Sequence, residues 1–341
     1  MSATQTVRYR RSPYLILYWA GNQPLLLNSH TLQGHNVHPN LISFLSELNE
    51  WSSVNEITDA NATVDSKDLA ELYKLGLLET ENDASTKDAM SFEWDPIELA
   101  VQRRTAHGGY WPDRDKPAPP VIHPKFITQP ATDLPTRARF LSMTLGEALE
   151  KRRTIRTYSD RSLRLEELSS LLYHAVRPLE CISDVQLGDR VLRPFPTAGA
   201  RSELEIYVIA VDVSGIERGA LYYDASSHRL LRLRDPDEQY ARIIKSVHSA
   251  TGEKLSRDPP VVLLITAVFE RVMWKYQGFG LSLIYKDVGT LFQTLYLIAT
   301  ALSLAPCAIG SGDEAENSRW LGLDPLRESQ VGCFIIGPNM D

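Results

Sequence analysis

The chain has 341 residues, 43% of them hydrophobic, and carries a formal net charge of −7 at pH 7. This length and apolar content allow either two domains or one catalytic domain with a smaller attachment. The acidic balance argues against broad binding to nucleic acid or to an anionic membrane, so neither is expected as a partner.

Residues 8–83 are predicted to form a small winged-helix-like domain. Apolar runs on either side of the turn at residues 20–22 favour two short strands, and helical spacing follows in two later segments. The expected strands and helices lie at residues 14–19, 23–28, 40–48 and 65–75.

The second of these helices carries charges of both signs. Asp65, Asp68 and Glu71 lie among Lys67 and Lys74, which makes a poor surface for phosphate groups. We therefore expect this domain to dock a peptide or a partner protein, or to pack structurally, rather than to bind DNA.

The cysteines and the N-terminus indicate the compartment. The three cysteines are widely spaced, which favours free thiols in a reducing environment; they are Cys181, Cys307 and Cys333. The apolar stretch after the N-terminal arginines is short and is interrupted at residues 21–23, unlike a signal peptide. The expected location is the cytoplasm.

Residues 84–140 are predicted to be a Pro-rich linker that wraps a surface. Prolines are dense between Trp111 and Pro120, and such a segment favours an extended tether over an independent fold. One amphipathic helix is expected within it, at residues 96–104.

Residues 141–341 follow an α+β pattern, in which helices cover a sheet. The expected helices lie at residues 144–151, 164–173, 237–249, 281–304 and 316–321. The expected strands lie at residues 203–211, 220–223, 230–233, 261–267 and 331–336, with a hairpin turn at residues 225–228.

The longest apolar stretch is predicted to be a buried helix rather than a membrane span. Residues 281–304 include Lys286, Asp287 and Gln293. Charges inside hydrocarbon are expensive, so no membrane association is expected.

Several kinds of site are excluded by missing motifs. No strand leads into a dinucleotide fingerprint, since Gly278-Phe279-Gly280 lacks the third glycine, and Gly310-Ser311-Gly312 has the wrong spacing for a hydrolase nucleophile. The chain also lacks a Walker loop and a Cys-x-x-Cys pair. His30, His35 and His38 cluster without nearby cysteine or carboxylate ligands, so no metal site is expected.

A basic segment opens the α+β region. Residues 151–156 hold four cations, and the segment continues into Tyr158. One interpretation is a solvated basic turn. The other is a phosphate clamp, because arginine forks match phosphate oxygens and Thr154 adds a hydroxyl donor.

A loop of small residues precedes the strand at residues 203–211. Pro196-Thr197-Ala198-Gly199-Ala200 lets backbone N–H groups approach a ligand closely, and the strand behind it supplies a rigid support. The segment is also compatible with an ordinary turn before a strand.

These segments, in this order, resemble the SagB-type branch of the FMN-dependent nitroreductase-like oxidoreductases. The resemblance covers about residues 90–341 and rests on residues 152–158, 193–200, 285–293 and 310–313 with Lys275-Tyr276. It implies an α+β nitroreductase-like FMN-binding fold, with a central, mostly antiparallel sheet flanked by helices, in a homodimer. The segment at 285–293 corresponds to a central helix that packs across that dimer.

The resemblance implies FMN contacts from three segments. The ribityl phosphate is expected at Arg152, Arg153, Thr154 and Arg156, the flavin beside Pro196, Thr197, Ala198 and Gly199, and the isoalloxazine ring near Gly310, Ser311 and Gly312. Without the resemblance, the third segment is simply a turn before a helix.

Lys275 and Tyr276 are the expected catalytic pair, again on the resemblance to azoline-oxidising enzymes. Oxidation of a thiazoline or oxazoline removes one proton and one hydride, so a base must face the flavin across the ring. A lysine whose pKa is lowered by partial burial takes the proton, and the phenol of Tyr276 orients or relays it.

The chain departs from the family pattern at two places. Basic residues near the C-terminus that contact the phosphate in other members are missing from residues 337–341, so the phosphate rests more heavily on Arg152 and Arg156. Thr197 stands where serine is usual and keeps the hydroxyl.

The expected function is FMN-dependent oxidation of azoline rings to azoles on a ribosomal or carrier-bound peptide. A cyclodehydratase complex is a candidate partner. The alternatives are another flavin-dependent natural-product dehydrogenation or NAD(P)H-dependent nitro or quinone reduction. A flavin-free binding scaffold is the alternative outside the enzyme class.

Overall fold

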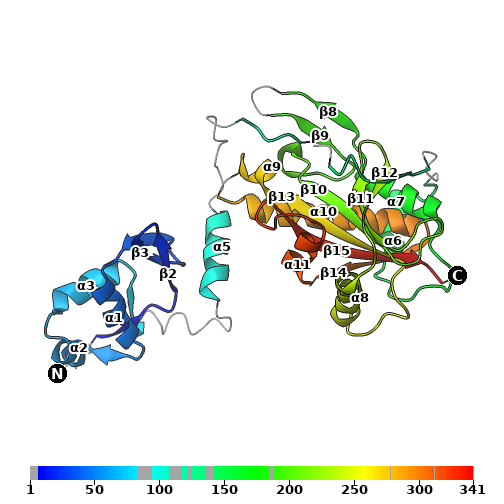
Figure 1. Cartoon of the computed structure of the whole chain (residues 1–341). Helices are drawn as coiled ribbons and strands as arrows, with labels where there is room; N and C mark the ends of the chain where they lie inside the picture. The colour runs from blue at the N-terminus through cyan, green and yellow to red at the C-terminus, as the bar shows by residue number, and fades with distance from the viewer. Residues whose placement is uncertain are drawn as a thin grey trace. The chain divides into compact units, whose positions relative to one another are not determined.

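The computed structural model describes residues 7–82, 94–106, 117–121, 125–135, 141–184, 188–276, 278–310 and 312–340. The chain divides into two compact units, Met1–Gly108 and Gly109–Asp341 (Figure 1). This division lies inside the predicted linker at residues 84–140. The three-part domain division made from the sequence stays a prediction.

The N-terminal unit contains two small antiparallel sheets. One has the order β2-β3-β4, and in the other β1 lies between β5 and β6. The strands are β1 (Arg8–Arg11), β2 (Leu15–Ala20), β3 (Gln23–Asn28), β4 (Gln33–Asn36), β5 (Ser52–Ser53) and β6 (Leu78–Thr80). The expected strand pair around the turn at residues 20–22 is therefore present as β2 and β3.

Helices of the N-terminal unit share one apolar core with its strands. These helices are α1 (Pro39–Glu47), α2 (Val54–Ala60) and α3 (Ser66–Lys74), and α5 (Pro96–Ala106) is a further helix of the unit that contributes no side chain to this core. Phe44, Ile57 and Leu69 place one buried side chain from each of α1, α2 and α3 in this core. The sequence analysis missed α2, whose start is fixed by reciprocal hydrogen bonds between Ser53 and Glu56.

The second unit is built on a seven-stranded antiparallel sheet with the order β14-β15-β13-β10-β11-β12-β7. Its strands are β7 (Ala131–Asp133), β10 (Leu204–Ala210), β11 (Gly219–Asp224), β12 (Arg229–Arg234), β13 (Val261–Val268), β14 (Leu304–Ile309) and β15 (Glu328–Pro338). A separate pair, β8 (Glu180–Ile182) and β9 (Arg190–Leu192), lies outside this sheet. The antiparallel sheet expected from the resemblance is confirmed.

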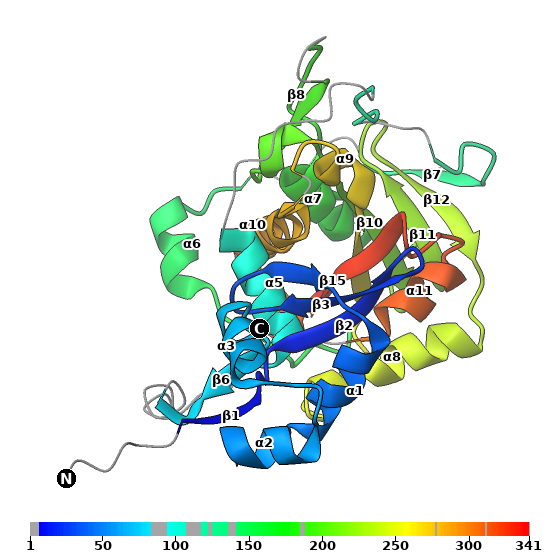
Figure 2. The ribbon, with the colours of Figure 1, turned by 90° about the vertical axis from the view of Figure 1, so that its left-hand side faces the viewer.

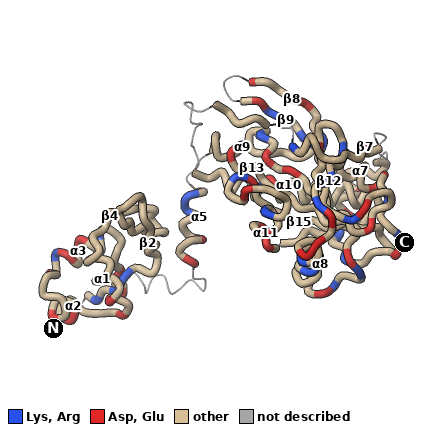
Figure 3. The backbone as a smooth tube through the Cα atoms, viewed as in Figure 1, with Lys and Arg blue, Asp and Glu red and all other residues tan. Residues whose placement is uncertain are grey.

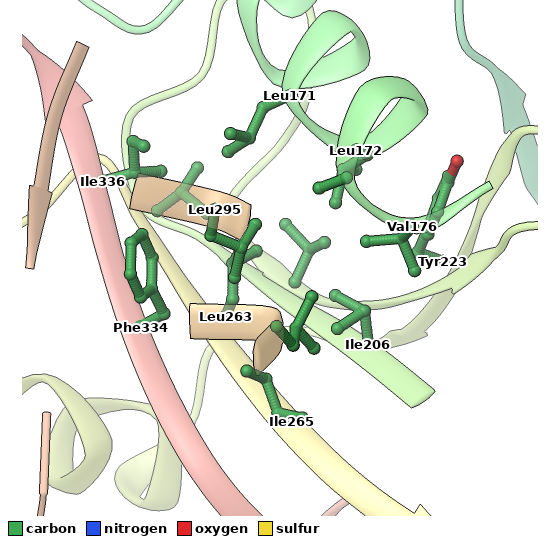
Figure 4. Packing of buried hydrophobic residues seen from close by; sticks show 14 of the residues in the cluster. Leu171, Leu172, Val176, Ile206, Tyr223, Leu263, Ile265, Leu295, Phe334 and Ile336 are labelled. Atoms are coloured by element: carbon green, nitrogen blue, oxygen red, sulfur yellow. The ribbon is translucent and has the colours of Figure 1, made fainter. Parts of the chain in front are cut away.

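Helices cover both faces of this sheet (Figure 1, Figure 2). They are α6 (Leu145–Lys151), α7 (Leu165–Val176), α8 (Glu238–Ala250), α9 (Phe269–Met273), α10 (Gly280–Ala301) and α11 (Glu314–Trp320). On one face, Leu171 of α7 and Leu295 of α10 pack over Leu263 of β13 (Figure 4). On the other face, Ile243 of α8 contributes to a second core.

Both faces of the central strands are buried. Every residue of β10 is buried, and seven of the eight residues of β13 are. A strand covered on both sides reads as a continuous apolar run, which is the pattern that made these strands predictable. Truncation of a core residue such as Leu263 to alanine is expected to destabilise the fold by about 2–5 kcal/mol.

The long helix is shorter than predicted. It ends at Ala301, whereas the sequence analysis continued it to residue 304. Ser303 adopts a left-handed φ of 58°, which turns the chain, and Leu304 then pairs with Pro338 as the first residue of β14. No described helix combines the length and apolar content needed to cross a membrane.

Part of the predicted linker belongs to the second unit. β7 forms its edge strand beside β12, and the ring centroid of Phe126 lies 6.3 Å from that of Tyr207 and 5.4 Å from that of Tyr222.

Cys307 and Cys333 are buried free thiols, and Cys181 is an exposed one.

Candidate functional site

The loop at residues 196–200 has a strained backbone. Gly199 has a φ of 60°, Ala200 of 55° and Ser202 of 51°. A left-handed conformation costs a non-glycine residue roughly 1–2 kcal/mol, so the surroundings must hold the loop in place.

Helix α10 supplies the anchors of this loop. The Ala198 N–H donates to Oδ2 of Asp287 at 2.6 Å, and Oγ1 of Thr290 donates to the Pro196 carbonyl at 3.1 Å. Just after the loop, the Ser202 N–H donates to Oγ1 of Thr197 at 3.3 Å. These bonds fix the loop against one turn of α10.

The Lys275-Tyr276 pair lies against the same loop. Both residues lie just beyond α9 and its C-cap Trp274, and their N–H groups donate to the Val272 carbonyl at 3.1 and 2.9 Å. A Cβ atom added to Gly199 would lie 2.7 Å from Oη of Tyr276 and 3.1 Å from Nζ of Lys275. Only glycine leaves room there, so the two expected catalytic side chains and the expected flavin loop meet at this point.

The surroundings shift the proton affinity of both side chains. Partial burial, followed by the positive charges of Arg201 and Arg190, lowers the pKa of Lys275. Burial and the nearby Asp287 raise the pKa of Tyr276. Lys275 is thereby made easier to deprotonate, and Tyr276 keeps its phenolic proton as a hydrogen-bond donor.

The basic segment is docked on a different part of α10. The Ile155 N–H donates to the Pro306 carbonyl at 2.9 Å, which aligns the segment with β14. Oγ1 of Thr154 lies 3.0 Å from Oη of Tyr296, and the Arg152 guanidinium lies 5.3 Å from the centroid of the Tyr296 ring. The side chains of Thr154 and Arg152 therefore both lie against Tyr296.

The other two arginines of the segment differ. The Arg153 side chain lies against the C-terminal end of α6, where its Nη1 donates to the carbonyls of Glu150 and Arg152 at 2.8 Å. Nε of Arg156 is buried and has no hydrogen-bond partner among the described residues. A buried donor without a partner is destabilising, and a phosphate oxygen is a suitable acceptor for it. The donor set at Arg152, Thr154 and Arg156 thus fits a phosphate.

The third expected segment lies between β14 and α11. Gly310 and Gly312 flank Ser311, which lies outside the described residues. Asp313 caps α11 by accepting the Glu316 N–H at 3.2 Å. A Cβ atom on Gly310 would meet no atom within 4 Å in the part of the chain that the structure describes.

The expected site residues therefore form two groups within one chain. The loop at residues 196–200, Lys275 and Tyr276 form one, and the basic segment near Tyr296 forms the other. No hydrogen bond between described residues joins them. Asp287 and Tyr296 are nine residues apart on α10, which is about 13.5 Å along the helix axis.

Two carboxyl groups at the site were missed by the sequence analysis. Asp287 and Glu203 are both buried, at 8% and 0% exposure. Asp287 was noticed only as a charge in an apolar helix, although a charge on the buried face of a helix is itself a functional signal. Glu203 precedes a strand without any pattern around it, and nothing in the sequence marks it.

Comparison with known proteins supports the family. The profile of the Nitroreductase family matches residues 149–338. A protein of Methanocaldococcus jannaschii described as a nitroreductase is 32% identical over 167 residues, which are 49% of this chain and 78% of that protein. The trifolitoxin-processing protein TfxB of Rhizobium leguminosarum bv. trifolii is 28% identical over 179 residues, which are 51% of this chain. The match spans 47% of TfxB, about half its length.

A solved structure shows the same fold. A crystal structure of a protein from Anabaena variabilis, described as a nitroreductase, superposes with a TM-score of 0.54 at 20% identity. The match covers 74% of this chain and 49% of that one. The family profile covers more than half of this chain, including the basic segment, the loop and Lys275-Tyr276. The chain therefore belongs to the nitroreductase family of oxidoreductases.

Proposed function

We propose that this protein is an FMN-dependent oxidase that converts azoline rings to azoles on a peptide or carrier-bound peptide. The observation that carries the proposal is the placement of Lys275 Nζ and Tyr276 Oη against Gly199. A general nitroreductase needs no base at this position, whereas removal of a ring proton does. The relative named for trifolitoxin processing supports a role in toxin or natural-product maturation.

FMN fits the donors of the two groups. Arg152, Thr154 and the unpaired Nε of Arg156 suit its phosphate, and the small residues of the loop allow a flat ring to approach. When bound, FMN accepts the hydride that leaves the azoline ring. Gly310 and Gly312 are proposed to lie near the ring system.

The proposed roles of the pair follow from its surroundings. Lys275 takes the ring proton on Nζ, because its lowered pKa raises the neutral fraction at neutral pH. Tyr276 keeps its proton and orients either Lys275 or the substrate through its hydroxyl. The ring then loses one hydrogen as a proton and one as a hydride, which gives the aromatic azole.

The protein is proposed to act as a homodimer with shared flavin sites. Leu145 and Leu149 of α6 are 67% and 50% exposed, and they lie one turn apart on one helix face. Exposed leucines next to each other favour burial by a second copy. The second group of site residues would then complete a flavin site begun by the first group of the partner.

The N-terminal unit is proposed to dock the substrate peptide, and a cyclodehydratase is a further proposed partner. β2 is an edge strand, and beside it lies a cavity of about 210 Å³ lined by Leu15, Leu17, Leu26 and Ile42. An edge strand beside an apolar pocket suits an extended peptide, with main-chain pairing for affinity and pockets for side chains. On α5, acidic and basic residues gather at opposite ends (Figure 3).

Incubation with azoline-containing peptides tests the proposed function. Mass spectrometry is expected to show the loss of two hydrogens per ring, together with a flavin spectrum of the purified protein that matches FMN. Rapid nitro or quinone reduction with NAD(P)H and no change in any azoline would favour the alternative suggested by the M. jannaschii relative. A colourless protein that cannot be reconstituted with FMN would favour a binding scaffold.

A further inference from the structure

Two buried carboxyl groups face each other beside the loop at residues 196–200. Glu203 directly precedes β10 and is completely buried, and Asp287 lies on the buried face of α10. The two carboxyl groups lie close enough that Asp287 raises the pKa of Glu203. Asp287 in turn accepts the Ala198 N–H through Oδ2 at 2.6 Å.

Neither oxygen of Glu203 receives a hydrogen bond from the described residues. An isolated carboxylate in such a place is strongly unfavourable, and two carboxylates side by side are more so. A single proton between them removes both problems, because a protonated Glu203 donates to Asp287. Asp287 is the better anion, since it already accepts the Ala198 N–H and lies next to Lys286.

The charged groups around the pair do not neutralise Glu203. Arg271 lies near it, but Nη1 of Arg271 is bound to Oε1 of Glu205 at 2.8 Å and to the Ser202 carbonyl at 2.7 Å. Arg201 also lies near it and donates to three backbone carbonyls. Tyr276 lies near Asp287, which together with burial raises the pKa of its phenol, so Tyr276 is uncharged.

The loop that Asp287 holds is the strained one. Three left-handed residues close together, Gly199, Ala200 and Ser202, persist only if the surroundings over-determine their conformation. The Ala198 N–H is the one amide of this turn bound by a carboxylate among the described residues. A neutral Glu203 leaves Asp287 free to accept that N–H.

We propose that Glu203 and Asp287 share one proton and act as positioning residues, which hold the loop at residues 196–200 against Lys275 and Tyr276. The pair touches neither substrate nor flavin and acts through the Ala198 amide. The link to catalysis rests on the proposed function, because the loop matters for turnover only if it carries the flavin. Burial and Asp287 raise the pKa of Glu203 to about 9, so the proton is expected to leave at alkaline pH.

Infrared spectroscopy of the purified protein detects the proposed protonated carboxyl group of Glu203 directly. Wild-type protein at neutral pH is expected to show the C=O stretch of a protonated buried carboxyl, which disappears with a midpoint near pH 9. Glu203→Gln is expected to lack this band. The matched control Glu238→Gln, an exposed glutamate of α8, is expected to keep it.

Flavin affinity over a range of pH supplies the functional readout. The affinity of the wild type for FMN is expected to fall at alkaline pH, where Glu203 loses its proton. Glu203→Gln retains a donor towards Asp287, so its affinity is expected to equal that of the wild type at neutral pH and not to fall at alkaline pH. Asp287→Ala removes the anchor of Ala198, and its affinity is expected to fall about 10-fold or more at every pH. Retained affinity in Glu203→Gln beside its loss in Asp287→Ala would show that hydrogen bonding through this pair holds the loop.

Each outcome has a definite meaning. A wild-type spectrum without a protonated carboxyl that titrates in the alkaline range overturns the proposal, and this test requires no variant to fold. An unchanged band in Glu203→Gln also overturns it. If the band behaves as expected but no azoline is oxidised, the proposed function fails alone. If azolines are oxidised but the band is missing, the shared proton fails alone.

Discussion

Oγ1 of Thr154 and Oη of Tyr296 lie 3.0 Å apart, and the same phenol accepts the Ala308 N–H at 2.8 Å. One side chain of α10 therefore joins the basic segment to β14. The contact fixes the backbone from which Arg152 and Arg156 project. The phosphate site is thus built on a rigid support, although its residues come from a connecting segment.

Removal of two arginines is expected to deplete the flavin. Arg152→Ala combined with Arg156→Ala deletes two charge-assisted contacts, each contributing about 1.5–3 kcal/mol to binding. The FMN content of the purified protein, read from its absorbance spectrum, is expected to fall sharply. Arg242→Ala, on the exposed face of α8, is the control and should leave the content unchanged. Full occupancy in the double variant would place the phosphate elsewhere.

Changes at the catalytic pair are expected to slow chemistry without loss of flavin. Lys275→Ala removes the proposed base, which is typically worth about 10²–10⁴-fold in rate, and Tyr276→Phe has a smaller effect because it removes only orientation. Anaerobic bleaching of the flavin by an azoline peptide measures this step. Lys245→Ala on α8 controls for the loss of a lysine. Bleaching of Lys275→Ala at the wild-type rate would show that the base lies elsewhere.

Gly199→Ala is expected to lower turnover, whereas an alanine at another left-handed glycine is not. In Gly199→Ala the new Cβ atom meets the Tyr276 hydroxyl at 2.7 Å and the Lys275 amine at 3.1 Å. Displacing the pair by about 1 Å is expected to lower turnover about 10²-fold. Gly252→Ala has a similar φ of +65° but no neighbour within 4 Å. Both variants should lose similar stability, and equal turnover in both would contradict the close approach.

The free energy of unfolding is expected to depend on pH through the protonation of Glu203. Its pKa is raised from 4.5 to about 9, so between these values the unfolded chain releases a proton that the native state keeps. This group therefore lowers the free energy of unfolding as pH rises through that range, by up to about 1.4 kcal/mol per pH unit. Denaturant unfolding of wild type and Glu203→Gln should show a difference that changes up to about pH 9 and then becomes constant.

The apolar cavity of the N-terminal unit is expected to affect long substrates alone. Leu17 lines the cavity, and Tyr18 points to the other face of β2, so Leu17→Lys and Tyr18→Lys form a matched pair. Leu17→Lys is expected to raise the KM for a full-length peptide and to leave FMN content and turnover of a short azoline unchanged. Equal KM values in both variants would assign the cavity another role.

Periodicity predicted the second unit better than the chemistry at its site. Strands β10 and β13 are continuous apolar runs, and α7 and α8 show helical spacing, so their existence follows from the hydropathy pattern alone. β14 was not predicted, because Ser303 turns the chain inside an apolar run. Neither hydropathy nor residue type signals such a turn at a serine.

The candidate site was only partly accessible from the sequence. Small residues and a run of arginines are local signals, and they led to the loop and the basic segment. The approach of Lys275 to Gly199 joins residues 76 positions apart and depends on how α9 follows β13. The meeting of Glu203 with Asp287 is equally non-local, and no spacing rule connects a strand with the middle of a distant helix.

Helix α10 carries contacts to both groups of site residues, and this limits how its sequence can change. Inserting one residue between Thr290 and Tyr296 would turn everything after it by about 100° and advance it by about 1.5 Å. Tyr296 would then leave Thr154 while Asp287 still held Ala198. A substitution in this helix changes contacts at one position only. An insertion or deletion changes the position of one group of site residues relative to the other, and would separate the proposed phosphate site from the proposed proton-transfer site. We expect the six-position spacing between Thr290 and Tyr296 to be more constant than the identities of the residues between them.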